Sequence, residues 1–217
     1  MKKCIILANG FPPNRNTVKF LQNKGYATLL CADGGANSAK TLDLIPAYII
    51  GDLDSIRQDV YEYYSDNSNI IKIIRQNDTD VEKCLKFAIK KKFDEVILLG
   101  ATGDRLDHSF CNLGIVLKYF GKIKIMIIHQ KSLLSAYSGS IILNTIPNEI
   151  ISLYGIDSKT RIKSTGLKYP LNNIALPFGQ KESTSNMAIN NKVHLQVKDG
   201  IIFVIRDFDL LRKHDLF

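Results

Sequence analysis

Long hydrophobic stretches are missing from this chain of 217 residues. The apolar runs, such as Ile123–Ile128 with one lysine inside, have the length of a strand and fall far short of a membrane span. The run Cys4–Ala8 lies near the first residue, but Asn9-Gly10 breaks it before it reaches the length of a signal-peptide core. We therefore expect a soluble, cytoplasmic protein with no membrane partner.

Several common metal and phosphate motifs are also absent. The four cysteines form no CxxC pair, and the four histidines show no HExxH spacing, so buried reduced thiols explain the cysteines better than a metal site does. The sequence contains neither GxxxxGK[ST] nor GxGxxG. This excludes a P-loop as the cradle of a phosphate ligand, so any phosphate must be held by other residues.

Charge is present in both signs but is unevenly distributed. The net charge is +8, yet residues 33–107 hold 14 acidic and 10 basic side chains, and the remainder holds 7 acidic and 19 basic ones. A basic excess favours a polyanionic ligand such as a nucleotide. We expect no nucleic-acid partner, because the lysines and arginines after residue 118 are scattered and no RNP-like strand or zinc-finger spacing accompanies them.

The first 130 residues alternate between short β-rich runs and segments with helical periodicity. The runs are Cys4–Ala8, Ala27–Ala32, Tyr48–Ile50, Ile70–Ile74, Val96–Leu99 and Ile123–Ile128. One predicted helix covers Thr79–Lys92 and opens with a capping box, and another covers Leu106–Tyr119. The second helix carries an apolar stripe of Leu106, Phe110, Leu113 and Leu117. This alternation predicts an α/β domain over residues 1–131, with a mostly parallel, Rossmann-like sheet flanked by helices.

The pattern changes in the last third of the chain. Strand-like runs separated by turns replace the alternation, at Ile141–Leu143, Ile150–Tyr154, Val193–Val197 and Ile201–Ile205. The tripeptide Lys198-Asp199-Gly200 predicts a tight hairpin between the last two runs. Residues 132–217 are therefore predicted to form a small antiparallel β-sandwich domain.

Polar groups follow four of the predicted parallel strands. They are Asp33–Asn37, Gly51–Ser55, Gln76–Asp80 and Gly100–His108. Each group alone is typical of a turn or a helix cap. Together they would meet at the carboxyl edge of the sheet, where several carboxylates repel one another unless a cation neutralises them. Oxygen-only ligands favour Mg²⁺ with substrate phosphates, and Arg105 is the natural cation for phosphate oxygens.

In this order and spacing, the groups resemble the bacterial type of thiamine pyrophosphokinase (thiamine diphosphokinase). The resemblance rests on Ala32–Asn37, Gly51–Ser55, Asp78–Asp80, Gly103–His108, Ser164–Leu171 and Ser185-Asn186. It implies transfer of a pyrophosphoryl group from ATP to the hydroxyl of thiamine, with thiamine diphosphate and AMP as products and Mg²⁺ as cofactor. It also implies a homodimer whose sites lie at the subunit interface.

The resemblance assigns roles to individual residues. Catalytic roles fall on Asp52, Asp54, Asp80 and Arg105, and the three aspartates among them would bind Mg²⁺. ATP would be contacted by Asp33, Asn37, Arg105 and Asp107. Thiamine would be contacted by Gln76, Thr79, Ser185 and Asn186, the last two from the partner subunit. The chain departs from the family pattern at Asp104 and Met187, and it has no tryptophan, so a Tyr or Phe would replace the indole that some relatives use against thiamine.

One other enzyme class is an alternative. The segment Asp52-Leu53-Asp54-Ser55 after an apolar strand is also similar to the phosphatases that use an aspartyl nucleophile on small phosphorylated metabolites. That nucleophile normally follows the first strand of its domain, whereas Asp52 follows the third predicted strand. A phosphatase would release inorganic phosphate and form no AMP.

Overall fold

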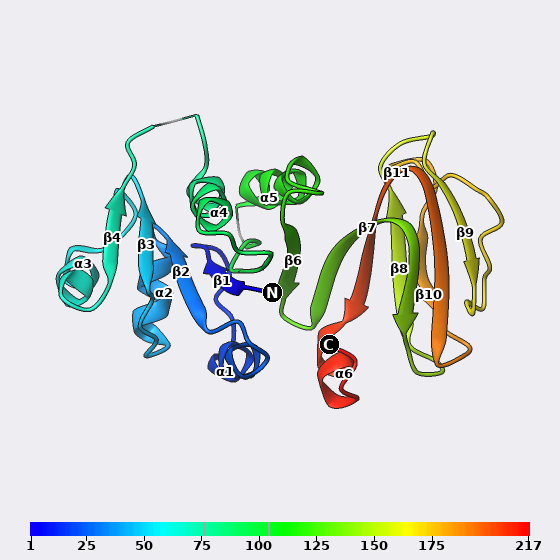
Figure 1. Ribbon diagram of the computed structural model, residues 1–217, viewed down its shortest axis with the longest axis horizontal. Coiled ribbons are helices and arrows are strands. Elements are labelled where there is room, and N and C mark those ends of the chain that lie inside the picture. Colours follow the sequence, from blue (N-terminus) through cyan, green and yellow to red (C-terminus); the bar gives the residue numbers. More distant parts are fainter. Residues whose placement is uncertain (76, 104) are drawn as a thin grey trace. The chain divides into compact units, whose positions relative to one another are not determined.

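The computed structural model describes residues 1–75, 77–103 and 105–217 (Figure 1). The chain divides into two compact units, Met1–Gln130 and Lys131–Phe217. The predicted domains, 1–131 and 132–217, differ from these units by one residue. No helix among the described residues is long and apolar enough to cross a membrane.

The first unit is built on a parallel sheet. Among its described residues the strand order is β4-β3-β2-β1-β5-β6, and each of these neighbouring pairs is parallel. The strands are β1 (Lys3–Leu7), β2 (Thr28–Ala32), β3 (Tyr48–Gly51), β4 (Asn69–Lys72), β5 (Glu95–Leu99) and β6 (Lys124–His129). The helices are α1 (Arg15–Asn23), α2 (Gly35–Thr41), α3 (Gln58–Ser65), α4 (Asp80–Lys90) and α5 (Leu106–Lys118). The predicted parallel sheet flanked by helices is confirmed.

The inner strands of this sheet form because their side chains are apolar on both faces. The β5 strand is buried along its whole length, and four of the five residues of β1 are buried. Burial on both faces is the reason that these strands are continuous apolar runs rather than alternating ones. The α4 helix is capped by the Thr79 hydroxyl, which accepts the Glu82 N–H at 3.3 Å. Only this half of the predicted capping box forms, because the Glu82 carboxylate accepts from Lys118 and Tyr119 instead.

The strand order creates a crevice at the carboxyl end of the sheet. The chain leaves β1 toward β2 but leaves β5 toward β6, so the two connections diverge between neighbouring strands. Ligands of open α/β sheets bind at such a switch point. The loops after β1 and β5 pack tightly there, because Gly10 N donates to Gly100 O at 2.7 Å. A Cβ on Gly10 would lie 2.5 Å from that oxygen, so a side chain does not fit.

The α5 helix turns part of its apolar stripe outward. Leu106 is 68% exposed and Phe110 is 58% exposed, whereas the face toward the unit carries Asn112, Ile115 and Val116. The Asn112 amide donates to Ala101 O at 2.6 Å and so anchors that face. The predicted apolar stripe is therefore present, but its first two residues, Leu106 and Phe110, stay exposed in this unit.

The second unit is antiparallel. Its elements are β7 (Ser132–Asn144), β8 (Ile150–Gly155), β9 (Arg161–Thr165), β10 (Ser183–Met187), β11 (Lys192–Asp207) and the short helix α6 (Phe208–Lys213). Among the described residues the order is β10-β8-β11-β7, and β9 also pairs with β11. The predicted antiparallel strand region is confirmed.

The predicted hairpin at Lys198-Asp199-Gly200 is wrong. These residues lie inside β11, which pairs with β7 on both sides of them and shifts register between Val197 and Ile202. Asp199 has a φ of 59°, so the turn-like tripeptide forms a bulge rather than a chain reversal. The first half of β11 pairs with β9 and the second half with β8, and side chains of all three strands contribute to one apolar core.

Candidate active site

A cavity of about 550 Å³ lies at the switch point of the first unit. Loops after β1, β2, β3 and β5 line it, together with the N-terminal turn of α4 and residues at the start of α5. Every polar group that the sequence pattern singled out in this half of the chain contributes residues to its lining. The carboxyl edge of the sheet is therefore where these groups meet.

Asp33 is the most deeply buried carboxylate of the cavity. It follows β2 with a φ of 41° and is 1% exposed. Its carboxylate accepts backbone N–H groups from Asp54 at 3.2 Å, Ser55 at 3.4 Å and Ile56 at 3.0 Å, which fixes the loop after β3. Burial raises the pKa of Asp33 to about 6, although the Ser55 N–H opposes the shift.

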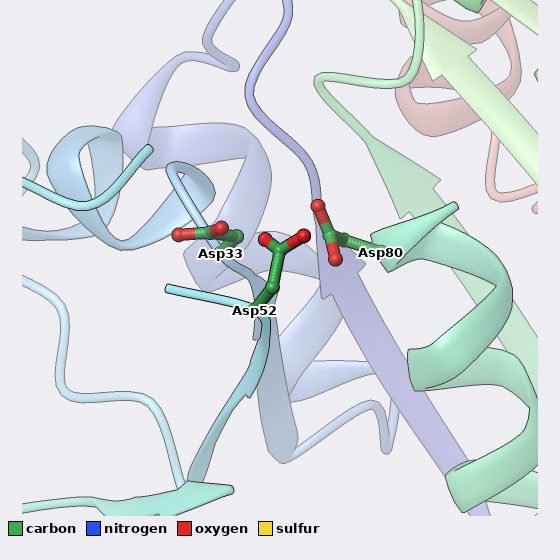
Figure 2. Close-up of side chains that lie close together, drawn as sticks. All are labelled: Asp33, Asp52 and Asp80. Atoms are coloured by element: carbon green, nitrogen blue, oxygen red, sulfur yellow. The ribbon is translucent and has the colours of Figure 1, made fainter. Parts of the chain in front are cut away.

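Three carboxylates converge at this point. Asp33, Asp52 and Asp80 each offer one oxygen, and these oxygens all lie within 4.8 Å of one another (Figure 2). They come from three separate segments: the ends of β2 and β3 and the first turn of α4. A set of hard oxygen donors at this spacing fits Mg²⁺, which binds carboxylates together with substrate phosphates. The cluster therefore has the chemistry of a metal–phosphate site.

Lys83, for which the sequence pattern predicted no role, lies beside this cluster. The side chain of Lys83 is 3% exposed, and its Nζ lies 2.8 Å from Asp80 Oδ1 and 3.7 Å from Asp52 Oδ2. The available signal was its spacing, because Lys83 follows Asp80 by three residues and so shares its side of α4. That spacing is common on solvent-exposed helices, so it did not distinguish Lys83 from the other lysines of the segment.

The predicted metal ligand Asp54 lies apart from the three carboxylates. Within the described residues the cluster contains Asp52 and Asp80 but not Asp54, which is exposed and accepts the Ser55 hydroxyl at 2.9 Å. Its backbone N–H, rather than its side chain, reaches Asp33. The structure thus brings Asp33, rather than Asp54, together with Asp52 and Asp80.

The residues predicted to contact ATP occupy different positions. Arg105 lines the cavity and forms an exposed bidentate pair with Asp107, with Nε to Oδ1 at 2.9 Å and Nη2 to Oδ2 at 2.6 Å. This pairing holds the pKa of Asp107 well below its usual range. The side chain of Asn37 braces a loop instead, since it donates to Ser55 O and accepts from Arg57 N, both at 3.0 Å.

The predicted thiamine residues are divided between the two units. Thr79 lines the cavity and caps α4, whereas Gln76, like Asp104, lies outside the described residues. In the second unit, Ser185 is exposed in β10 with a φ of 54°. Asn186 is 1% exposed. Its side-chain oxygen accepts the backbone N–H of Tyr169 at 3.2 Å, and its side-chain nitrogen donates to the backbone carbonyl of Tyr169 at 2.8 Å. The Asn186 side chain therefore holds a turn that presents Tyr169, which is 61% exposed.

Comparisons with known proteins agree with this arrangement. Residues 21–127 match the family described as thiamin pyrophosphokinase, catalytic domain, and residues 140–202 match thiamin pyrophosphokinase, vitamin B1 binding domain. Thiamine pyrophosphokinase 3 of Oryza sativa subsp. japonica is 30% identical over 213 residues, which cover 84% of this chain and 76% of that protein. Thiamine pyrophosphokinase of Bacillus subtilis is 28% identical over 193 residues, 86% of each chain.

The fold is also found among solved structures. The crystal structure of thiamine pyrophosphokinase from Bacillus subtilis superposes with a TM-score of 0.82 at 24% identity, covering 96% of this chain and 100% of the other. This similarity shows that the two chains share their fold over almost their whole length.

Proposed function

Because the chain belongs to the thiamin pyrophosphokinase family, we propose that it transfers a pyrophosphoryl group from ATP to the hydroxyl of thiamine in a Mg²⁺-dependent reaction. The products are thiamine diphosphate and AMP. The observation that carries the proposal is the convergence of Asp33, Asp52 and Asp80 in a cavity at the switch point, within the segment that matches the catalytic domain. Both family domains are matched in one chain, so acceptor and donor sites are both expected.

The residues of the cavity suit a reaction that depends on positioning and charge neutralisation. Asp52 and Asp80 would hold Mg²⁺, since both the family resemblance and the geometry select them. When bound, Mg²⁺ neutralises charge on the phosphates and makes the attacked phosphorus more electrophilic. Arg105 would turn its guanidinium donors to phosphate oxygens, and Asp80 would orient the attacking hydroxyl of thiamine.

Asp33 and Asp54 are the competing candidates for the third metal ligand. The geometry favours Asp33, but its carboxylate already accepts three backbone N–H groups and holds the loop after β3. The resemblance favours Asp54, which is exposed and adjacent to that loop. Titration of Asp54→Asn with Mn²⁺ decides between them, because a ligand role predicts weaker binding at unchanged thermal stability.

Thiamine would contact Gln76 and Thr79 of one subunit and Ser185 of its partner, whereas Asn186, which is 1% exposed, would hold the backbone of Tyr169 rather than touch thiamine. We propose Tyr169 as the aromatic surface that replaces the missing tryptophan, because Asn186 fixes its backbone and its ring is exposed. A homodimer would also give the outward apolar residues Leu106 and Phe110 of α5 a surface to cover them.

The activity is tested by incubating the protein with ATP, Mg²⁺ and thiamine and separating the nucleotides. AMP formed in step with thiamine diphosphate is the expected result. ADP as the product would mean γ-phosphoryl transfer instead, and inorganic phosphate without AMP would favour the phosphatase alternative. Asp66→Asn is the matched control for Asp variants, since Asp66 is an exposed residue at the end of α3.

The shared site is tested by mixing two inactive variants. Asp52→Asn removes a proposed metal ligand, and Ser185→Arg blocks the proposed thiamine surface on the second unit. If each site combines the first unit of one subunit with the second unit of the other, refolded mixtures should regain about a quarter of wild-type activity, because half of the dimers are mixed and each has one intact site. Absence of recovery, with dimers present by light scattering, would contradict a shared site.

A further inference from the structure

Lys83 is unusual because it is a lysine buried in a cavity lined by carboxylates. Its side chain is 3% exposed, whereas Lys86, one turn farther along α4, is 41% exposed. Lysines are almost never fully buried unless they are paired. The pairing partners of Lys83 are Asp80 Oδ1 at 2.8 Å and Asp52 Oδ2 at 3.7 Å.

These partners belong to different segments of the chain. Asp80 starts α4, and Asp52 follows β3, so the ammonium group of Lys83 connects the helix to the end of a strand. An exposed pair three residues apart on one helix contributes little. Lys83 differs from such a pair because it is buried and has two carboxylate partners. Its ion pairs are therefore stronger, since electrostatic interactions strengthen when water is excluded.

The positive charge of Lys83 offsets part of the negative charge of the three carboxylates. Three ionised carboxylates within 4.8 Å of one another carry three negative charges and repel each other. The ammonium group reduces this to two, which a single divalent cation neutralises. Without Lys83, the repulsion would push the side chains of Asp52 and Asp80 apart whenever the metal and the nucleotide are absent.

We propose that Lys83 is a positioning residue that holds Asp52 and Asp80 together in the free enzyme. It acts through these two carboxylates and keeps them at the spacing that Mg²⁺ and the triphosphate require. This inference rests on the proposed function for its catalytic consequence, but its effect on the free protein is independent of that function.

The first test measures thermal unfolding without any substrate. We expect Lys83→Met to lower the midpoint by about 5 °C in EDTA, on the scale of the loss of one buried ionic contact in a chain of this size. Saturating Mg²⁺ should raise the midpoint of Lys83→Met more than that of the wild type, because the metal then supplies the missing positive charge. Lys90→Met, an exposed position on the same helix, is the matched control and should match the wild type in both conditions.

A double variant keeps the test decisive if Lys83→Met folds poorly. Asp52→Asn combined with Lys83→Met restores the net charge of the cluster, so the double variant should recover most of the midpoint lost by Lys83→Met in EDTA. A double variant that unfolds no higher than Lys83→Met in EDTA, or an equal loss for Lys83→Met with and without Mg²⁺, would overturn the proposal and leave Lys83 as a packing residue.

The second test separates positioning from structure in the reaction. We expect Lys83→Met to lower kcat about 10-fold to 100-fold with little change in the KM for thiamine, because misplaced carboxylates impair the transition state more than acceptor binding. Lys83→Arg should recover part of the loss. An unchanged kcat would contradict the proposal. If the wild type forms no AMP, the proposed function fails while the thermal test of Lys83 still stands.

Discussion

In the second unit the buried charges meet one to one, whereas in the first unit three carboxylates share the space around Lys83. Arg206 Nε donates to Glu149 Oε1 at 2.6 Å, and Nη2 donates to Glu149 Oε2 at 2.9 Å and to Asn144 O at 2.6 Å. This pair is satisfied by the protein itself and joins β11 to the segment before β8. The carboxylates of the first unit retain an excess of negative charge, which is the condition expected of a site that receives a cation from solution.

Breaking the one-to-one pair should produce the largest effect. Arg206→Met leaves Glu149, which is 1% exposed, as a buried charge without its partner. We expect the free energy of unfolding to fall by about 3–5 kcal/mol, measured by urea denaturation. Replacing both residues, as Arg206→Met with Glu149→Leu, should recover most of the loss. A double variant as unstable as the single one would show that the pair itself, and not the stranded charge, provides the stability.

In the first unit, removing one carboxylate should impair activity rather than folding. We expect Asp52→Asn to reduce kcat/KM for the proposed transfer by about 100-fold or more, while its free energy of unfolding in EDTA stays the same or rises because repulsion is relieved. Asp66→Asn should behave as the wild type in both assays. Undiminished Mg²⁺-dependent AMP production by Asp52→Asn would contradict the proposed role of this residue as a metal ligand.

A smaller effect is expected where the site and the fold use the same residue. Thr79→Ala removes the cap of α4 and should lower the free energy of unfolding by about 1 kcal/mol, whereas Thr79→Ser keeps the hydroxyl and should lose much less. If Thr79 also contacts thiamine, the KM for thiamine should rise in Thr79→Ala. A loss of stability with no change in KM would restrict Thr79 to its role as a cap.

The smallest effect concerns an exposed carboxylate of the second unit. Asp157 accepts the N–H groups of Lys159 at 2.9 Å and Thr160 at 2.8 Å and the Thr160 hydroxyl at 3.0 Å, and hydrogen bonds from Thr160 lower its pKa. A carboxyl group whose pKa is lower in the folded state stabilises the fold above its unfolded pKa of about 3.9 and loses this contribution as the pH falls through the folded value. Asp157→Asn should therefore be less stable than the wild type near neutral pH, and urea denaturation should show the difference shrinking in acid.

The two units also differ in how well sequence patterns describe them. In the first unit, buried strands such as Glu95–Leu99 lie within one residue of their predicted ends, because continuous apolar runs between helices have few other ways to pack. In the second unit, Lys198-Asp199-Gly200 has the composition of a hairpin but forms a bulge in β11. Turn-forming residues allow a change of direction, and the pairing of both halves with β7 decides that the strand continues.

In the candidate site, too, the sequence pattern predicted some features and missed others. The positions of Asp52, Asp80 and Arg105 after strands or at the start of helices predicted where they would meet, because parallel strands end at one edge of the sheet. The sequence pattern did not predict that the Asn186 side chain hydrogen-bonds to the backbone of Tyr169, or that Leu106 and Phe110 are exposed. Those facts depend on which surfaces neighbouring segments cover, and periodicity does not encode this.

The sequence by itself determined the alternation of strands and helices, the cap at Thr79 and the family resemblance, because these depend on local spacing and on residue types. The tertiary structure decided that Asp33 rather than Asp54 stands beside Asp52, and that Lys83 lies among the carboxylates. The reason is the strand order: placing β2 between β1 and β3 brings the ends of separate segments within a few ångströms, and only then do their charges interact.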